Sequence, residues 1–393
     1  MGMLRTLPEL DVAEKRVLVR VDFNVPLHDG QVANDKRLRE ALPTINYLIK
    51  HKARVILASH LGRPKGKVVE ELRLDPVAHR LGELLGTEVR KLNDCIGPEV
   101  EQAAAQLGPG EVVLLENLRF HPGEEANDPE FAQALAKLAE AFVNDAFATA
   151  HRKHASNYGV ARLLPAAAGF LMEREIEALT KVRDEPEHPF LILSGGKKAE
   201  DKVGVLLDLL DRADAFLIGG GVAFTLLKAQ GHEVGDSIVA QELLPQAERF
   251  LEEAKKQGKK VILPVDVKAA RELSADAEVR TFPATEIPPG WKGLDIGPET
   301  VEAFKREIAQ AKMIVWTGPL GAFELEPFAQ GTREVAEAVA ASGAFSVIGG
   351  GETAEVIEEL GLAEKMGHVS TGGGACLHFL RGKELPALEP LRR

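Results

Sequence analysis

The sequence predicts an α/β protein of two lobes, each built on a mostly parallel sheet covered by helices. Short apolar, β-branched runs alternate along the chain with longer segments of helical periodicity, which is typical of parallel sheets joined by crossover helices. The runs are apolar on both faces, as expected for strands covered by helices on each side. Together these observations favour Rossmann-like lobes separated by a cleft.

The predicted strands are the apolar runs themselves. In the first half of the chain they cover residues 16–22, 54–60, 112–117 and 141–147. In the second half they cover residues 190–196, 215–221, 260–266, 313–319, 345–351 and 368–374. Among the helices between them, residues 128–142 carry apolar side chains at helical spacing as far as Phe142, with Asp128 as the N-cap and Pro129 in the first turn.

A domain boundary is predicted where a helix over residues 171–182 gives way to RDEPEHP (183–189), a charged segment with two prolines. We therefore expect an N-domain over residues 1–170, an inter-domain helix and hinge over 171–188, and a C-domain over 189–375. A length of 393 residues fits this division.

Composition and charge argue against several classes of protein. A net charge of -12 disfavours general nucleic-acid binding. Cys95 and Cys376 lie far apart and lack CxxC spacing, which disfavours a disulfide framework or a zinc site and favours a reducing compartment, the cytoplasm. The first residues lack the apolar core of a signal peptide, and no run of about 18 apolar residues predicts a membrane helix.

Basic side chains follow the predicted strands of the first half. The carboxyl ends of parallel strands meet at one edge of a sheet, where ligands bind. Arginine offers a planar fork that matches phosphate and carboxylate groups, and Asp22 and Asn24 can accept hydroxyl groups or hold an arginine. We therefore expect a small, multiply anionic, hydroxylated ligand at this edge, near Arg37, His60, Arg63, Arg119 and Arg152.

Two other interpretations of these residues stay open. A single arginine after a strand is more often a solvated surface residue, although five basic or protonatable residues at successive strand ends are harder to explain in that way. The segment HRKH (151–154) resembles a metal-binding pattern, but it has no neighbouring cysteine or carboxylate, which disfavours a metal site.

In the second half, glycine clusters end the predicted strands, at residues 195–196, 219–221, 349–351 and 372–374. Glycine lets the backbone approach a phosphate and direct N–H groups toward it, although single clusters also serve as simple tight turns. Lys198 and Lys202 share one face of a predicted helix over residues 199–210, where a bound anion would offset their conflict with the helix dipole. Alternatively, Glu200 and Asp201 neutralise them at a solvated surface.

Several known nucleotide-binding motifs are absent from the sequence: GxxxxGK[ST], GxGxxG, and the HRD and DFG motifs of protein kinases. The motifs that are present point elsewhere. RVDFNVP (20–26), SHLGRP (59–64), ENLRFHPGEE (116–125), NDAFATAHRKHAS (144–156), GLDIGPET (293–300), GPLGAFE (318–324), GGGET (349–353) and STGGGA (370–375) occur in order over essentially the whole chain. In these motifs the sequence resembles the phosphoglycerate kinase family.

The resemblance implies a reversible phosphoryl transfer from 1,3-bisphosphoglycerate to ADP, giving 3-phosphoglycerate and ATP. It implies that the N-domain binds 3-phosphoglycerate, that the C-domain binds the nucleotide with Mg2+, and that hinge closure brings the lobes together. It also implies that residues 376–393 pack back onto the N-domain. A cytoplasmic monomer with no nucleic-acid or membrane partner is expected.

The resemblance also assigns residues to the two sites. The acid site would use Asp22, Phe23, Asn24, Arg37, His60, Leu61, Gly62, Arg63, Arg119 and Arg152. The nucleotide site would use Lys198, Lys202, Gly219, Gly220, Gly293, Glu324, Gly350, Gly351, Glu352 and Thr353, with Gly221 also near the adenine. The groups expected at the transferring phosphoryl are Arg37, Lys198, Gly350 and Gly373, and Glu352 is the expected Mg2+ ligand.

Three positions depart from the family pattern. Glu352 stands where an aspartate is common, Thr317 where an asparagine is common, and Lys197 where an alanine is usual. Alignment on Asp201 and Lys202 places the catalytic lysine at Lys198.

Two competing interpretations of the whole chain remain. One is a dehydrogenase or ligase on the same two-lobed frame, and the other is a two-lobed binding protein without catalysis.

Overall fold

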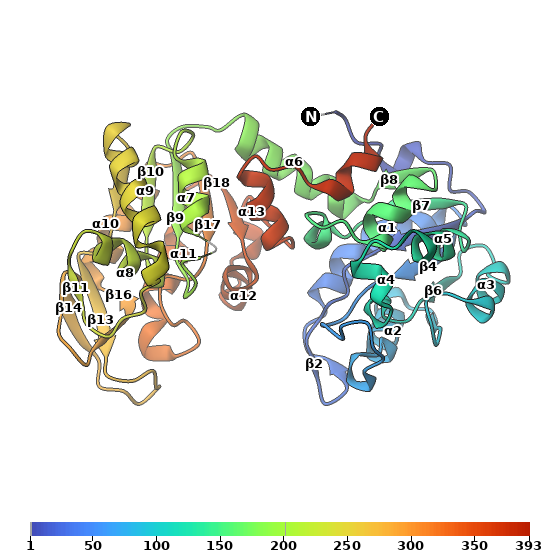
Figure 1. Ribbon diagram of the computed structural model, residues 1–393, viewed down its shortest axis with the longest axis horizontal. Helices are drawn as coiled ribbons and strands as arrows, with labels where there is room; N and C mark the ends of the chain where they lie inside the picture. The colour runs from blue at the N-terminus through green and yellow to red at the C-terminus, as the bar shows by residue number, and fades with distance from the viewer. Residues whose placement is uncertain (1, 201) are drawn as a thin grey trace. The chain divides into compact units, whose positions relative to one another are not determined.

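A computed structural model of the protein describes residues 2–200 and 202–393. The chain divides into two compact units, which we describe separately. Unit 1 extends as far as Glu177 and also includes Glu384–Arg393, and unit 2 is Ala178–Lys383. The division falls within helix α6 (Phe170–Asp184), which continues from one unit into the other (Figure 1).

Unit 1 is built on a six-stranded sheet with the strand order β5-β6-β4-β1-β7-β8. All of its neighbouring strands are parallel, so their carboxyl ends lie at one edge. The strands are β1 (Arg16–Arg20), β4 (Arg54–Ala58), β5 (Arg90–Lys91), β6 (Val112–Leu114), β7 (Ala141–Asn144) and β8 (Ala166–Ala168). A separate antiparallel pair consists of β2 (Leu27–His28) and β3 (Gln31–Val32).

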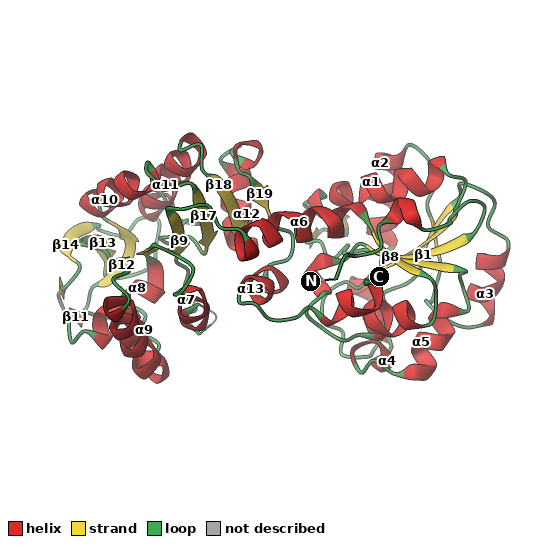
Figure 2. Ribbon diagram, turned by 90° about the horizontal axis from the view of Figure 1, so that it is seen from above, coloured by secondary structure: helices red, strands yellow, loops and turns green. Residues whose placement is uncertain are grey.

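Helices cover both faces of this sheet. The helices of unit 1 before α6 are α1 (Lys36–Lys50), α2 (Asp75–Leu85), α3 (Pro98–Ala105), α4 (Pro122–Glu125) and α5 (Pro129–Ala136). Alternate residues of β1, such as Val17 and Val19, are buried in one core with Leu38 and Ile45 of α1. Helices α1 and α2 therefore cover one face, and α5 lies on the opposite face (Figure 2).

The last residues of the chain pack onto unit 1. The 3-10 helix η10 (Pro386–Leu391) follows α13 (Gly374–Leu380), and Ala387 N donates to the carbonyl of Ala150 at 3.1 Å. Near the ends, Arg5 N donates to the Leu391 carbonyl at 2.8 Å, so the two termini lie side by side (Figure 1).

Unit 2 contains a second six-stranded parallel sheet, with the order β12-β10-β9-β17-β18-β19. Its strands are β9 (Phe190–Ser194), β10 (Ala215–Ile218), β12 (Lys260–Ile262), β17 (Met313–Thr317), β18 (Phe345–Gly349) and β19 (His368–Val369). Beside it lie an antiparallel sheet of β13 (Asp266–Ala270), β14 (Arg280–Pro283) and β16 (Lys292–Ile296), and a pair of β11 (Glu233–Val234) and β15 (Glu286–Ile287).

The helices of unit 2 also cover both faces of the main sheet. They are α7 (Val203–Leu209), α8 (Gly220–Ala229), α9 (Leu244–Lys256), α10 (Pro298–Ile308), α11 (Gln330–Ala341), α12 (Gly351–Glu359) and α13 (Gly374–Leu380). Phe304 of α10 and Val335 of α11 share a buried core with Leu193 and Trp316 of the sheet. Helices α7 and α9 lie on the other face (Figure 2), where Phe250 contacts Phe216 edge-on. No helix among the described residues is both long enough and apolar enough to cross a membrane.

The predicted fold class is confirmed, while several element boundaries differ. The strands end earlier than predicted because the segments after them, such as residues 22–24 after β1 and Gly220 after β10, lie in loops or begin helices. The predicted helix over 128–142 is wrong beyond Ala136: α5 ends there, and Phe142 lies in β7. Its start is confirmed, because Asp128 Oδ1 accepts a hydrogen bond from Phe131 N at 2.9 Å, with Pro129 as the first helical residue.

The helix predicted over residues 199–210 begins only at Val203, and Lys202 is its N-cap. Lys198 precedes this helix, so the prediction that Lys198 and Lys202 share one helix face is wrong. The physical reason lies in the loop before them. Gly196 has a φ of 93° and donates its N–H to the Pro319 carbonyl at 2.7 Å, which holds this loop out of helical geometry.

Candidate active site

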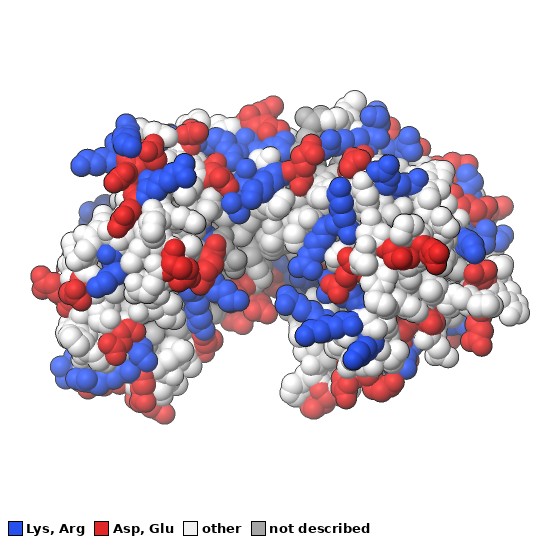
Figure 3. All heavy atoms as spheres, in the orientation of Figure 1, with Lys and Arg blue, Asp and Glu red and all other residues white. Residues whose placement is uncertain are grey.

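The acid site expected from the sequence lies at the carboxyl edge of the unit 1 sheet. Asp22 follows β1, and its Oδ2 accepts a hydrogen bond from Arg37 Nη1 in the first turn of α1. His60 follows β4 and is 4% exposed, and Arg119 follows β6 and is 5% exposed. Figure 3 shows Lys and Arg side chains gathered along one edge of unit 1, in the right half of the view.

A second set of contacts fixes the loop after β4. Asn24 Oδ1 accepts a hydrogen bond from Gly62 N at 2.8 Å, and Arg119 Nη1 donates to the Gly62 carbonyl at 2.8 Å. Three strand ends are therefore tied together by direct hydrogen bonds. The guanidinium groups of Arg37 and Arg119 are held by acceptors from other segments, which orients them before any ligand binds.

The electrostatics of this edge favour a bound anion. Burial opposes ionisation of Asp22, but Arg37, His60 and Arg20 outweigh it and hold its pKa below the usual value. Burial keeps the pKa of His60 well below 6.5; Asp22 opposes this effect, and Arg20, Arg119 and Arg37 add to it. His60 is therefore a neutral imidazole at pH 7, and the positive charge at the edge comes from the arginines.

The remaining acid-site residues are placed in different ways. Phe23 and Leu61 have buried side chains, and Phe23 lies in the core under α1. These two residues can offer a ligand only their main-chain groups. Arg63 and Arg152 are exposed. Arg152 is close enough to Arg119 to lower the pKa of that arginine, after the larger effect of burial, whereas Arg63 stands outside the hydrogen bonds described above.

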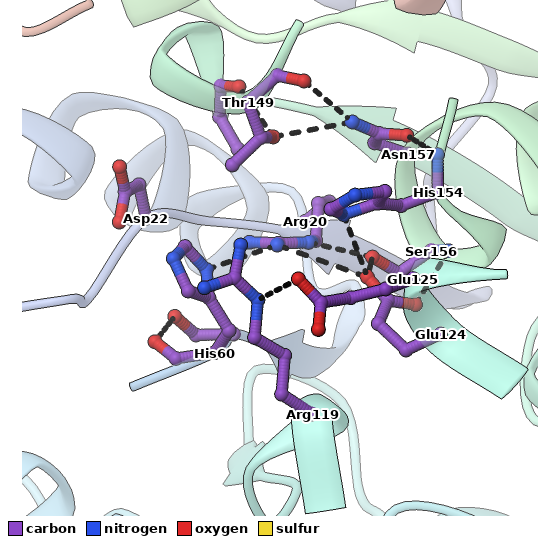
Figure 4. Close-up of polar contacts among 12 residues, drawn as sticks. Arg20, Asp22, His60, Arg119, Glu124, Glu125, Thr149, His154, Ser156 and Asn157 are labelled. Carbon is purple, nitrogen blue, oxygen red and sulfur yellow. Dashed lines mark hydrogen bonds and ion pairs between the residues drawn. The ribbon is translucent and has the colours of Figure 1, made fainter. Parts of the chain in front are cut away.

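A buried polar network beneath this edge was missed from the sequence (Figure 4). Arg20 and Glu124 are both 0% exposed, and Ser156 and His154 lie beside them. Burial, with smaller contributions from Arg20, Arg119 and Arg152, lowers the pKa of His154 to about 3. One signal was available, because Arg20 is a charged residue inside the apolar strand RVLVRVD (16–22).

Unit 2 contains a pocket of about 370 Å³. Its lining comes from the glycine turns after β9 and β10, from β16, from the loop after β17, and from α12. A volume of a few hundred Å³ suits a nucleotide-sized ligand. Gly293 is required for close packing there, because a Cβ at this position would lie 2.2 Å from the Phe224 ring. The predicted residues that line the pocket are Gly220, Gly221, Gly293, Glu324 and Glu352.

Two other predicted residues support the loop after β17. Lys202 Nζ donates to Thr317 Oγ1 at 2.8 Å, and Thr353 Oγ1 accepts from Gly318 N at 2.6 Å. Both contacts lie at the carboxyl end of β17, so they connect the start of α7 and the first turn of α12 to that strand end. Of the other predicted nucleotide-site residues, Gly219 follows β10 as the N-cap of α8, and Gly350 and Gly351 follow β18 as the N-cap and the first residue of α12.

The lysine pair is placed unequally. Lys197 lines the pocket, and its Nζ lies 2.6 Å from Glu324 Oε1. Burial opposes ionisation of Glu324, but the hydrogen bond from Lys197, a backbone hydrogen bond and the charge of Lys197 together outweigh it and lower the pKa of Glu324. Lys198 is exposed in the loop before α7, and Gly373 begins the turn into α13. Asp201, used in aligning the lysines, lies outside the described residues.

The pocket can also hold a divalent cation. Glu352 lies in the first turn of α12, and Glu355 of the same helix also lines the pocket. Carboxylate oxygens are the ligands that Mg2+ prefers, so these residues fit the ion. A separate group in unit 1 brings Asp94, Cys95 and His121 together. There Asp94 Oδ1 already lies 2.6 Å from His121 Nε2 and accepts from Cys95 N at 2.7 Å, which explains the arrangement without an ion.

The fold and the two sites define a class of protein, the small-molecule kinases built on two α/β units. Comparisons with known proteins identify the family. The family model described as phosphoglycerate kinase matches residues 7–383. Phosphoglycerate kinase of Moorella thermoacetica is 55% identical over 386 residues, covering 98% of each chain. That of Thermomicrobium roseum is 54% identical over 388 residues, covering 99% of each chain.

Solved structures agree. Phosphoglycerate kinase from Coxiella burnetii has a TM-score of 0.88 and 42% identity, with 99% of both chains covered. The enzyme from Pyrococcus horikoshii has a TM-score of 0.89 and 36% identity, with 99% of this chain and 98% of the other covered. The chain belongs to the phosphoglycerate kinase family, whose members are ATP:3-phospho-D-glycerate 1-phosphotransferases of glycolysis.

Proposed function

We propose that the chain transfers a phosphoryl group reversibly from 1,3-bisphosphoglycerate to ADP, with the acid bound to unit 1 and the nucleotide to unit 2. The observation that carries the proposal is the convergence of Asp22, Arg37, His60 and Arg119 at one sheet edge. In a protein with a net charge of -12, such a basic cluster favours the binding of a small polyanion at this edge. Family membership over nearly the whole chain supports phosphoglycerate as that anion.

At the acid site, Arg119, Arg152 and Arg63 hold the phosphate and carboxylate oxygens of 3-phosphoglycerate. Arginine suits both groups because its fork donates two parallel hydrogen bonds. Asp22 and Asn24 accept hydroxyl groups of the acid, and the main chain of Phe23, Leu61 and Gly62 closes the site. Because Asp22 already holds Arg37, the acid meets an oriented guanidinium.

At the nucleotide site, the turns at Gly219–Gly221 and Gly293 admit the adenine, because they present backbone without side chains. Glu324 accepts hydrogen bonds from the sugar hydroxyls once the side chain of Lys197 moves away from its carboxylate. Lys198, Lys202 and the start of α12 at Gly350–Thr353 hold the phosphates. Glu352 holds Mg2+, which neutralises charge on the phosphate oxygens when it is bound.

Phosphoryl transfer passes through a loose transition state with charge on the equatorial oxygens, so fixed positive charge and in-line positioning matter most. Arg37 from unit 1 and Lys198 from unit 2 supply that charge, and the N–H groups near Gly350 and Gly373 complete the cradle. Because these groups belong to different units, the proposal includes a hinge movement that closes the two units on the ligands. Closure also excludes water that would hydrolyse the acyl phosphate.

The proposal includes three further properties: the enzyme works in the cytoplasm, it acts as a monomer, and it uses no nucleic-acid partner. The test of the proposed function is a coupled assay of ATP formation from 1,3-bisphosphoglycerate and ADP with Mg2+. We expect ATP to form only when both substrates are present. A chain that binds both ligands without forming ATP would be a binding protein, and a requirement for a nicotinamide cofactor would indicate a dehydrogenase.

A further inference from the structure

Arg20 is a buried cation in which each of the three guanidinium nitrogens has a partner. It lies at the end of β1 and is 0% exposed, so each of its N–H groups needs an acceptor inside the protein. Nε donates to Ser156 Oγ at 2.7 Å, and Nη1 donates to the Val21 carbonyl at 2.5 Å. Nη2 lies 3.1 Å from His60 Nδ1 and 4.0 Å from Glu124 Oε1.

Glu124 and Ser156 form the floor of this arrangement. Glu124 is 0% exposed, and it accepts from Ser156 twice: from the hydroxyl at 2.5 Å and from the backbone N–H at 3.0 Å. The hydroxyl proton of Ser156 points to Glu124, which leaves the lone pairs of Ser156 Oγ for Arg20 Nε. Glu124 therefore fixes Ser156, and both fix Arg20 (Figure 4).

The contact between Arg20 and His60 determines where the histidine carries its proton. A guanidinium group has only N–H donors and no acceptor. Nδ1 of His60, 3.1 Å from Arg20 Nη2, must therefore be the acceptor and carries no proton. The single proton of the neutral ring is then on Nε2, and Nε2–H is the only donor that the ring can offer to a ligand.

We infer that Glu124 and Ser156 are positioning residues of the acid site: through Arg20 they hold His60 in the Nε2–H tautomer, as a neutral donor to an anionic oxygen of the acid. The inference rests on the proposed function for the identity of that acid, but the tautomer itself does not depend on a ligand. Both side chains are buried, so their effect on a ligand passes through Arg20.

The charged groups that face His60 agree with a neutral ring over the physiological range. Asp22 after β1 would favour an imidazolium ion, whereas Arg20, Arg119 and Arg37 oppose it together with burial. A protonated Nδ1 would also place its N–H against the N–H of Arg20. The ring thus donates a hydrogen bond to an anion but does not take up a proton in the course of binding.

The test is nitrogen-15 NMR of the ligand-free full chain with labelled histidines. The chain has 11 histidines, and the His60 signals are assigned as those missing in His60→Gln. We expect two-bond couplings typical of a neutral ring protonated at Nε2, unchanged between about pH 5.5 and 8. A ring protonated at Nδ1, or a ring that titrates within this range, would overturn the inference.

The positioning role is tested in Ser156→Ala, which removes the acceptor of Arg20 Nε. We expect the His60 signals to show exchange between tautomers and the KM for 3-phosphoglycerate to rise roughly tenfold, while the KM for ADP stays constant. Ser156→Thr, which keeps the hydroxyl, should restore the wild-type pattern. Glu124→Gln removes the carboxylate with little change of shape and should change the His60 signals and the KM in the same direction. It serves as the test if Ser156→Ala does not fold.

Ser346→Ala is the matched control. Ser346 is 0% exposed and lies in unit 2, where its hydroxyl accepts from Gly367 N at 3.1 Å. This variant should change stability but neither the His60 signals nor the KM for the acid. His60 signals in Ser156→Ala that are identical to those of the wild type would refute the positioning role. Failure to form ATP with the Nε2–H pattern intact would contradict the proposed function and leave the tautomer supported.

Discussion

Replacing Arg152 by alanine tests the acid site without disturbing the core of unit 1. The side chain is exposed, and its Nε donates to His151 Nε2 at 3.2 Å. It is near enough to Arg119 and His154 to lower the pKa of both, after the larger effect of burial on each. The change therefore removes positive charge at the proposed phosphate position, and it opens no cavity.

The size of the expected effect follows from the exposure of this arginine. Losing a hydrogen bond to a charged group costs about 1.5–3 kcal/mol, or roughly 10- to 150-fold in affinity. Solvent screening at an exposed position favours the lower end, so we expect the Kd for 3-phosphoglycerate to rise about tenfold. Calorimetric titration measures this Kd, and the Kd for ADP, in the same preparation. The difference should shrink as salt is added.

Arg90→Ala is the control for the change in net charge. Arg90 is an exposed arginine of the edge strand β5 in the same unit, at the far end of the strand order from β7. It should leave both affinities unchanged. An equal loss of affinity for ADP in Arg152→Ala, or an equal loss for the acid in Arg90→Ala, would refute the assignment of the acid to this edge.

Three further changes test unit 2. Activity should vanish with a chelator and return with Mg2+, and Glu352→Gln should raise the Mg2+ concentration needed, because an amide is a poorer ligand for this ion; an unchanged titration curve would remove Glu352 from the site. Lys198→Ala should lower kcat by roughly 10²–10³, and Lys197→Ala much less, although Lys197 lies in the pocket wall; exchanged effects would contradict the lysine assignment. Burial raises the pKa of Asp295 from 3.8 to about 7. Between these two pH values the folded chain holds a proton that the unfolded chain has lost, so the stability of the wild type should fall as the pH rises through this range. The stability of Asp295→Asn should not show this fall. Thermal midpoints at pH 5 and pH 8 that differ equally in both proteins would refute this.

Much of the fold was predictable from the sequence because the strands are apolar on both faces. The alternation of apolar runs and helical segments located β1, β4, β6 and β7 of the first parallel sheet, all the strands of the second, and the start of α5 at Asp128, but it missed the short edge strands β5 and β8. The ends were less predictable. Leu138 and Phe142 continue the helical spacing of α5, but the chain turns after Ala136 because Phe142 pairs with β8 as part of β7.

The meeting of the proposed acid-site residues at one sheet edge was predictable for a different reason. Charged side chains stood at successive strand ends, and parallel topology brings such ends to one edge. The support of that site was not predictable from spacing alone. Glu124 and Ser156 are 32 positions apart and meet only in the folded chain, where they hold Arg20. Likewise, the loop after β9 depends on backbone contacts with Pro319, which no local pattern reveals.

The central claim is that the acid and the nucleotide bind to different units and react only when both are present. A ligand shifts a conformational equilibrium only by its differential affinity for the two states, and on this proposal each ligand alone contacts mainly one unit. Solution X-ray scattering of the free chain, the two binary complexes and the ternary complex tests this most directly. The account predicts the smallest radius of gyration in the ternary complex, with smaller changes in either binary complex. A radius that stays constant across all four states would contradict it.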